Sequence, residues 1–151
     1  MVINMKMQVT KNEDVTLVTL NNVPHCIGLI ASIFSGFCQK AVNVDMISQT
    51  APFGGKISIC FTVPGDELPA LLEYAPSIRA LSPDIIVAVS DGNGKILLYD
   101  ETMRTTPGVA AQVFQTLADA NIDVRMVTTS EADISILVGR DQLDAAAALF
   151  D

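Results

Sequence analysis

The sequence repeats itself at an interval of 80 residues. Without a gap, segment 15–50 aligns on segment 95–130. Identical residues align at Leu17 and Leu97, Gly28 and Gly108, Ala31 and Ala111, Phe34 and Phe114, Val44 and Val124, and Met46 and Met126. Apolar residues also align where identity is lost, as Ile33 does with Val113. A repeat of this size predicts two copies of one folded unit.

Hydrophobic spacing in the first copy predicts a strand, a helix and then a hairpin. The run 15–20 is β-rich, and the positions with helical spacing are Leu29, Ile30, Ile33, Phe34 and Phe37. Apolar and polar residues then alternate over 42–47 and again over 57–63, as in half-buried strands. Between these two strands, Pro52, Gly54 and Gly55 predict the turn of a hairpin.

The rest of the first copy predicts a second helix and a fourth strand. The helix follows Gly65, and its expected buried residues are Leu68, Leu71, Leu72 and Ala75. A buried strand over 85–90 is expected to end in a turn at 91–94, where the sequence reads Asp-Gly-Asn-Gly. The copy is therefore a βαββαβ unit, the ferredoxin-like α+β sandwich of one antiparallel sheet and two helices.

The second copy starts at Lys95 and has the same order up to its last helix. Thr106 is expected to cap its first helix and Pro107 to occupy the first turn. The residues expected on the buried face of that helix are Val109, Ala110, Val113, Phe114 and Leu117. A hairpin over 122–129 and 134–138 follows, and then a helix that Asp141 caps and that ends at Phe150.

No fourth strand follows that last helix, whereas the N-terminus offers one that the first copy does not need. Ile3, Met5, Met7 and Val9 alternate with polar residues, as in a strand. We expect this strand to complete the second sheet. The predicted domains are therefore 14–92, and 1–13 together with 93–151, with the first inserted in the second.

Composition restricts the function. The chain has 9 basic and 17 acidic residues, a net charge of -8, and its basic residues form no cluster, which disfavours nucleic acid as a partner. With one histidine, the sequence predicts neither a metal site nor a cofactor. Cys26, Cys38 and Cys60 lie in apolar runs, so we expect buried thiols in a reducing compartment. No secretory or membrane-spanning pattern appears, and a cytoplasmic location is expected.

Both copies resemble the tandem ACT-domain regulatory region of aspartokinase. The residues that resemble its first ACT domain are Val23 to Gly28, Phe34, Val42 to Gln49 and Ile57 to Val63. Those that resemble its second are Met103, Pro107 to Ala111, Phe114, Ile122 to Val127 and Thr129 to Glu131. In that family the first domain is inserted in the second, and a kinase domain longer than this chain precedes the pair.

The resemblance implies a regulatory chain without the catalytic kinase domain, and hence not an enzyme. It implies that the chain senses an aspartate-family amino acid such as threonine or lysine, forms a homodimer through its ACT domains, and regulates an aspartokinase catalytic chain. In the family, the effector binds between ACT domains of two chains.

Carried over by position, the resemblance gives three groups of candidate ligand-binding residues. They are the loop His25, Cys26, Ile27, Gly28, Leu29 and Ile30, the strand residue Gln49, and the opposite wall of Asp123, Val124 and Ser130. The family commonly has an acidic residue or asparagine at the position of His25 and proline at that of Ile27. A second possible pocket comprises Thr106, Pro107 and Gly108, although Asp100 to Thr102 replace the glycines usual in the family.

The chemistry of these residue types suits a free amino acid. Backbone amides at a helix N-terminus attract a carboxylate, and we expect Gly28 and Gly108 to open the first helix of each unit. Asp45 and Gln49 lie four residues apart on one predicted strand, so we expect both on the same face as acceptors for the ammonium group. Alternatively, both glycines serve only tight turns, and His25 and Asp45 are only solvated surface residues.

Two other functions remain open. One is a dimerisation or assembly module of the same fold that binds no ligand, which the departures from the family at His25 and Asp100 make plausible. The other is an acyl-phosphate hydrolase on the same fold, in which Arg104, beside Thr106, would hold an anion. Two glycine-rich segments, 53–55 and 92–94, are interpreted as turns rather than phosphate loops.

Overall fold

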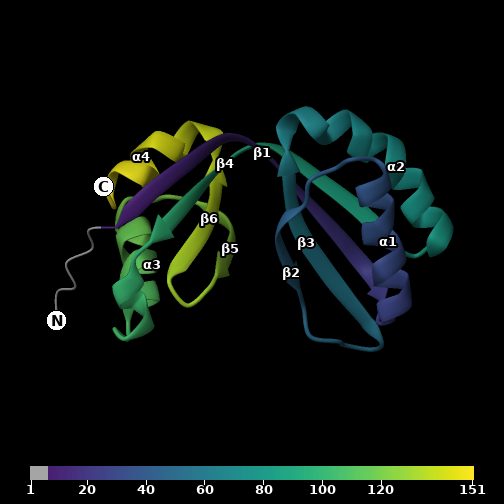
Figure 1. The fold of residues 1–151 in the computed structure, drawn as a ribbon, viewed down its shortest axis with the longest axis horizontal. Helices are drawn as coiled ribbons and strands as arrows, with labels where there is room; N and C mark the ends of the chain where they lie inside the picture. The colour runs from purple at the N-terminus through teal and green to yellow at the C-terminus, as the bar shows by residue number, and fades with distance from the viewer. Residues whose placement is uncertain (1–6) are drawn as a thin grey trace. The chain divides into compact units, whose positions relative to one another are not determined.

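The computed structural model describes residues 7–151 (Figure 1). The chain packs as two compact units, one of Val15–Asp91 and one of Gly92–Asp151 with the described residues up to Asp14. Two long strands, β1 (Gln8–Pro24) and β4 (Ile86–Tyr99), each contribute residues to both units. The domain boundaries expected from the sequence, 14–92 and 1–13 with 93–151, stay a proposal.

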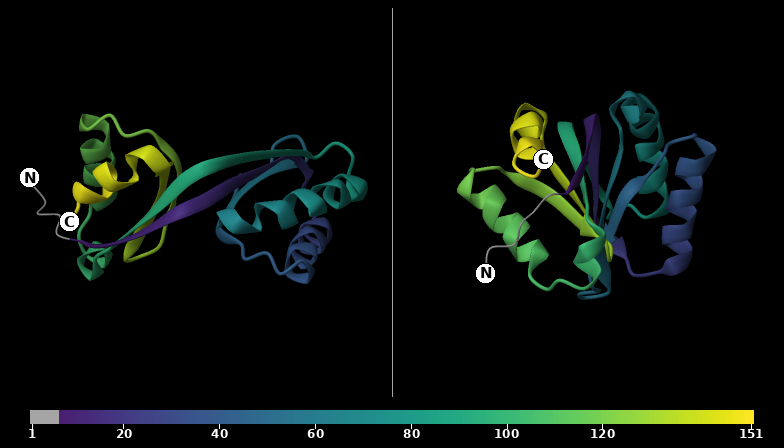
Figure 2. Two further views of the ribbon diagram at one scale, coloured as in Figure 1. Left: turned by 90° about the horizontal axis from the view of Figure 1, so that it is seen from above. Right: turned by 60° about the vertical axis from the view of Figure 1, so that its left-hand side comes forward.

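In the Val15–Asp91 unit, two helices pack on a sheet in the strand order β2-β3-β1-β4 (Figures 1 and 2). Its further elements are α1 (Ile27–Gln39), β2 (Asp45–Gln49), β3 (Lys56–Pro64), the 3₁₀ helix η1 (Gly65–Glu67) and α2 (Leu68–Leu81). The pairs β1–β3 and β2–β3 are antiparallel. This is the ferredoxin-like order that the βαββαβ pattern predicts.

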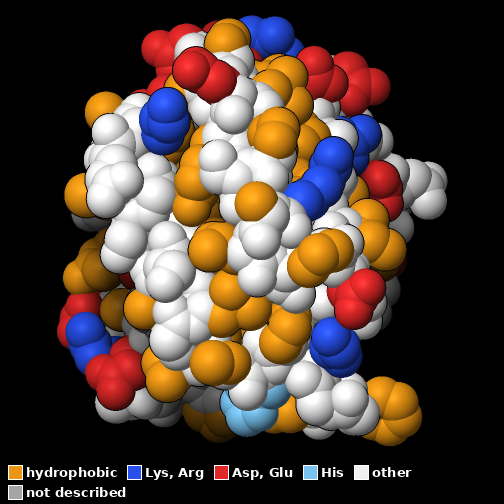
Figure 3. All heavy atoms as spheres, turned by 90° about the vertical axis from the view of Figure 1, so that its right-hand side faces the viewer, with side chains coloured by type: hydrophobic (Ala, Val, Ile, Leu, Met, Phe, Trp, Pro, Cys, Tyr) orange, Lys and Arg blue, Asp and Glu red, His pale blue; other side chains and the backbone are white. Residues whose placement is uncertain are grey.

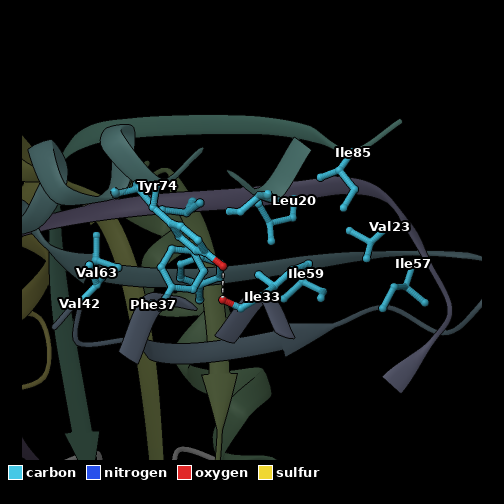
Figure 4. Close-up of a cluster of buried hydrophobic side chains, with 14 residues drawn as sticks. Leu20, Val23, Ile33, Phe37, Val42, Ile57, Ile59, Val63, Tyr74 and Ile85 are labelled. Atoms are coloured by element: carbon cyan, nitrogen blue, oxygen red, sulfur yellow. Dashed lines mark hydrogen bonds between the residues drawn. The ribbon is translucent and has the colours of Figure 1, made fainter. Parts of the chain in front are cut away.

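Alternate residues of β3 point into the core of this unit, where they meet the helices (Figure 4). Phe61 is fully buried, and its ring centroid lies 5.1 Å from that of Phe37 on α1. Phe37 in turn lies 4.9 Å from the ring of Tyr74 on α2, edge to face. The Tyr74 hydroxyl donates a hydrogen bond to the Ile33 carbonyl at 2.9 Å, so the two helices are joined through a buried polar contact.

The Gly92–Asp151 unit has the strand order β5-β6-β4-β1. Its further elements are the 3₁₀ helix η2 (Glu101–Arg104), α3 (Val109–Asp119), β5 (Val124–Thr129), β6 (Asp133–Gly139), the 3₁₀ helix η3 (Arg140–Gln142) and α4 (Leu143–Ala148). Met7 is 8% exposed and packs in its core, with Val9 beside it. The other two residues of the predicted N-terminal strand, Ile3 and Met5, lie outside the described residues.

Several expectations about element ends are wrong. No turn forms at 91–94, because β4 runs through this segment and Asn93 is fully buried within it. The part of β4 before this segment was expected to be buried, but it is partly exposed to solvent, and Ile86 is 60% exposed. Neither Thr106 nor Asp141 caps a helix: Gly108 is the N-cap of α3, and η3 precedes α4. Pro107 accordingly lies before α3 rather than in its first turn.

Some residues expected in the core are exposed. Leu72 on α2 and Phe114 on α3 are 53% and 44% exposed, and Ala110 is exposed as well. The cysteines also differ from expectation, because Cys26 and Cys38 are exposed and Cys60 is half-buried, all three as free thiols. Figure 3 shows hydrophobic side chains reaching the surface on the side of the molecule that carries α1 and α2.

Two further observations bear on membrane insertion and on metal binding. Among the described residues, no helix is both long and apolar enough to cross a membrane. In the same part of the chain, no group of three or more histidine, cysteine, aspartate or glutamate side chains is placed to hold a metal ion.

Candidate functional site

The start of α1 is an exposed helix N-terminus without a side-chain cap. The His25 amide donates to the Gly55 carbonyl at 2.9 Å, which ties the end of β1 to the hairpin turn. Cys26 is the N-cap in an extended conformation, and the helical ladder begins when the Ile30 amide donates to its carbonyl at 3.1 Å. The amides before Ile30 have no acceptor within the helix, and the first turn has no acidic residue. This end therefore attracts a carboxylate.

Gly28 lies in the first turn of α1 rather than at its opening. The helix starts one residue earlier, at Ile27, and Gly28 does not have the positive φ of a tight-turn glycine. A Cβ added at Gly28 would meet only the Cys26 sulfur, at 3.9 Å. Packing therefore does not require glycine here, and its missing side chain leaves the adjacent amides accessible. The tight-turn interpretation applies instead to Gly108, whose φ is 87°.

Asp45 and Gln49 are not on one face of β2, contrary to expectation. Asp45 pairs with Thr62 but Gln49 pairs with Ile59, so four steps along β2 oppose only three along β3. The extra residue forms a bulge, in which Met46 has a φ of 52°. Paired residues share a face, and β3 partners three apart face opposite ways. Gln49 and Asp45 therefore cannot both contact one ligand from the same side of the sheet.

A shallow depression of about 420 Å³ lies at the sheet end where β1 gives way to α1. Its lining includes Thr50, which directly follows Gln49, and Lys56, which pairs with Pro24 at the end of β1. Asn22 also lines it and donates to the Asp84 carbonyl at 3.2 Å. The lining thus carries a cation and an amide, but it includes none of the residues at the start of α1.

The opposite-wall residues lie in the other unit and are spread along β5. Asp123 and Val124 are at its start, and Ser130 follows its end. At about 3.3 Å per residue, six strand residues separate them by roughly 20 Å. The structure therefore does not bring Ser130 together with Asp123. The Asp123 carboxylate lies 3.9 Å from Arg125 Nε, and the Asp123 backbone amide donates to the Gln142 side chain at 3.0 Å.

The second possible pocket, at Thr106 to Gly108, adjoins a network of charged side chains. Arg104 donates to Glu101 at 2.5 Å and also to Glu131, and Tyr99 donates to Glu101 at 2.6 Å. The hydrogen bonds from Tyr99 and Arg104 lower the pKa of Glu101, and the bond to Glu101 raises the pKa of Tyr99. Two carboxylates already bind the Arg104 guanidinium, which disfavours the anion site expected of an acyl-phosphate hydrolase.

Known proteins resemble this chain in both sequence and fold. The ACT domain family matches residues 96–149. This match lies within the Gly92–Asp151 unit. A curated aspartokinase from Geobacillus stearothermophilus is 30% identical over 134 residues, which cover 89% of this chain and 32% of that protein. The chain thus spans about a third of the length of this relative.

Solved structures extend the similarity to both units of the chain. The regulatory subunit of aspartate kinase from Thermus flavus matches with a TM-score of 0.83 and 25% identity, covering 94% of each chain. A structure of aspartokinase alpha and beta subunits matches with a TM-score of 0.79 and 27% identity over 93% of each chain. Aspartokinase III of E. coli, in complex with lysine and aspartate, matches at a TM-score of 0.70 and 22% identity, over 97% of this chain and 34% of that one. The last likeness concerns the fold alone.

Sequence reasoning missed two residues around Asp123. Gln142 accepts the Asp123 amide, and Arg125 pairs with the Asp123 carboxylate and donates to the buried Asn93. These contacts join segments distant in sequence, so local spacing does not reveal them. Glu67 makes the corresponding contact in the first copy, but the 80-residue offset of the repeat does not align Glu67 with Gln142.

Proposed function

We propose that this chain is an amino-acid-binding regulatory protein that senses an aspartate-family amino acid such as threonine or lysine. The observation that carries the proposal is the exposed, uncapped start of α1, where Gly28 leaves the first-turn amides open to a ligand carboxylate. The similarity to aspartokinase regulatory subunits supports the same role.

The proposed site lies between two chains in a homodimer. One chain contributes His25 to Ile30 and Gln49, and the opposite chain contributes Asp123 and Val124. The ends of the strand order support self-association, because among the described strands β2 and β5 each have a neighbour on one side only. Ser130 has no place in this pocket if Asp123 lines it, given their positions at opposite ends of β5.

We further propose that the regulated partner is an aspartokinase catalytic chain in the cytoplasm. The match to a structure of aspartokinase alpha and beta subunits supports a catalytic partner. The free cysteines, two of them exposed, suit a reducing compartment. Regulation follows when the ligand binds one dimer arrangement more tightly, and a coupling of about 1–3 kcal/mol between effector and partner is typical.

Calorimetric titration with the aspartate-family amino acids tests the proposal, with other amino acids as the comparison panel. We expect saturable binding of threonine or lysine, with one equivalent per chain. Thermal denaturation should shift upward as the bound amino acid is raised, because a ligand of the folded state stabilises it. Absence of binding throughout the panel would favour the ligand-free assembly module.

Gly28→Ala is the sharpest variant for the proposed site. The added methyl group has room in the free protein, and alanine is favoured over glycine in a helix by about 0.5–1 kcal/mol, so the melting temperature should hold or rise. A ligand seated on the amides would meet that methyl group, and we expect its affinity to fall at least about tenfold, a change of ~1.4 kcal/mol. Ser35→Ala, an exposed residue about two turns further along α1, is the control and should bind normally.

A further inference from the structure

Both units contain the same side-chain clamp between a 3₁₀ helix and the loop that leads into the edge strand. In the Val15–Asp91 unit, Glu67 at the end of η1 accepts the backbone amide of Asn43 at 2.7 Å and its side-chain amide at 3.0 Å. In the Gly92–Asp151 unit, Gln142 at the end of η3 accepts the backbone amide of Asp123 at 3.0 Å. Asn43 and Asp123 are equivalent residues, 80 positions apart.

The second clamp differs in that its side chain also donates. Gln142 Nε2 donates to the Asn121 carbonyl at 3.3 Å, so one half-buried amide holds the loop at two points. Asn121 has a φ of 55° and directly follows the C-cap of α3. The segment from the end of α3 to the start of β5 is thereby held from η3, in addition to the backbone hydrogen bonds that end α3.

We infer that Gln142 is a positioning residue for the effector pocket: by holding the Asp123 backbone, it sets where the Asp123 carboxylate meets the ligand ammonium group. This inference rests on the proposed function, because it takes Asp123 as part of the ligand wall. Gln142 itself does not touch the ligand. The carboxylate of Asp123 lies 3.9 Å from Arg125 Nε. A shift of the loop would therefore change both the direction of this carboxylate and its distance from the Arg125 guanidinium.

Gln142→Met and Gln142→Glu separate the clamp from mere packing. Methionine has a similar length but neither accepts nor donates an amide hydrogen bond well, whereas glutamate accepts the backbone amide, as Glu67 does in the other unit. Losing the acceptor should speed hydrogen exchange of the Asp123 amide and weaken amino-acid binding, each by about three- to tenfold. Gln142→Glu keeps the acceptor for the Asp123 amide but loses the bond to the Asn121 carbonyl, so its exchange rate and affinity should lie between those of wild type and Gln142→Met. Gln115→Met, which removes an exposed glutamine bonded to Asp119 on α3, is the matched control.

Amide exchange by NMR and calorimetry with threonine and lysine provide the two readouts. Faster exchange at Asp123 and weaker binding in Gln142→Met, both partly recovered in Gln142→Glu, support the inference. Faster exchange with unchanged affinity overturns it, as does equal loss of affinity in the Met and Glu variants. If the wild-type protein binds no amino acid, both the proposed function and the positioning role are wrong. Hydrogen exchange at the Asp123 amide then shows only whether the clamp exists.

Discussion

Two glycines on α1 have different reasons to lack a side chain. At Gly28 an added Cβ meets little, but at Gly36 it would lie 1.8 Å from the Tyr74 hydroxyl oxygen. The tyrosine ring packs against Phe37, and its hydroxyl is bonded to the Ile33 carbonyl, so it has little freedom to withdraw. Gly36 is therefore required by the crossing of α1 and α2, whereas Gly28 is open for function.

Gly36→Ala should destabilise the protein although alanine favours helix. The clash with Tyr74 forces the two helices apart, and overpacking of this kind costs about 1–3 kcal/mol. Urea denaturation measures the effect, and Gly28→Ala on the same helix is the matched control. A Gly36→Ala protein as stable as the wild type would show that α1 and α2 do not pack in this way.

Glu101 provides a pH-dependent contribution at the residue scale. Hydrogen bonds from Tyr99 and Arg104 lower its pKa below the ordinary 4.5. The ionised carboxylate is thus favoured in the folded state, so its contribution is present above pH 4.5 and is lost as pH falls through the lower, folded-state pKa.

Glu101→Gln should consequently lower the melting temperature at pH 7 by a small amount, because the network is exposed. The difference from wild type should shrink as the pH is lowered below 4.5, and scanning calorimetry from pH 7 to pH 3 follows it. Glu73→Gln, which removes a carboxylate 3.8 Å from Lys40 on the surface, serves as the control. A difference that grows at low pH would contradict the assigned direction.

At the scale of elements, α1 and α3 end in the same way. The residue after each C-cap, Ala41 or Asn121, has a φ of 57° or 55°. The next amide, of Val42 or Ile122, reaches back to the carbonyl of Phe37 or Leu117 at 3.0 Å. This Schellman arrangement favours glycine, tolerates asparagine and strains alanine.

Ala41→Gly should therefore stabilise the protein, by about 1 kcal/mol, through relief of the left-handed backbone. Ala31→Gly is the control, because the same change within α1 should destabilise it by about 0.5–1 kcal/mol. Chemical denaturation of both variants measures the two signs. If both variants are less stable than wild type, α1 does not end in the left-handed conformation at Ala41.

For the whole molecule, the repeat predicted the fold because its apolar positions are mostly the ones that are buried in the structure. Alternating apolar residues such as Ile57 and Phe61 are buried in the described sheet, and helical spacing placed Ile33 and Phe37 in the core. What failed depended on contacts between distant segments. The sequence 91–94 is typical of a turn, but Asn93 is buried and bonded to Arg125, and the strand continues.

The candidate site was predictable only in part for the same reason. The start of α1 was expected within one residue of where it lies, since helical spacing and Gly28 mark it. Asp45 and Gln49 were misassigned to one face, because the bulge at Met46 is set by pairing with β3 and has no local signature. The clamp by Gln142 likewise depends on packing of η3 against the loop before β5.

The exposed thiols of α1 offer a practical consequence. Cys26 lies at the first end of the helix and Cys38 in its last turn, and both are accessible to a maleimide reagent. With Cys38 changed to serine, the reagent would attack Cys26 beside the open amides. A small metabolite seated on those amides would slow that reaction, so the rate of labelling would report occupancy for each compound added.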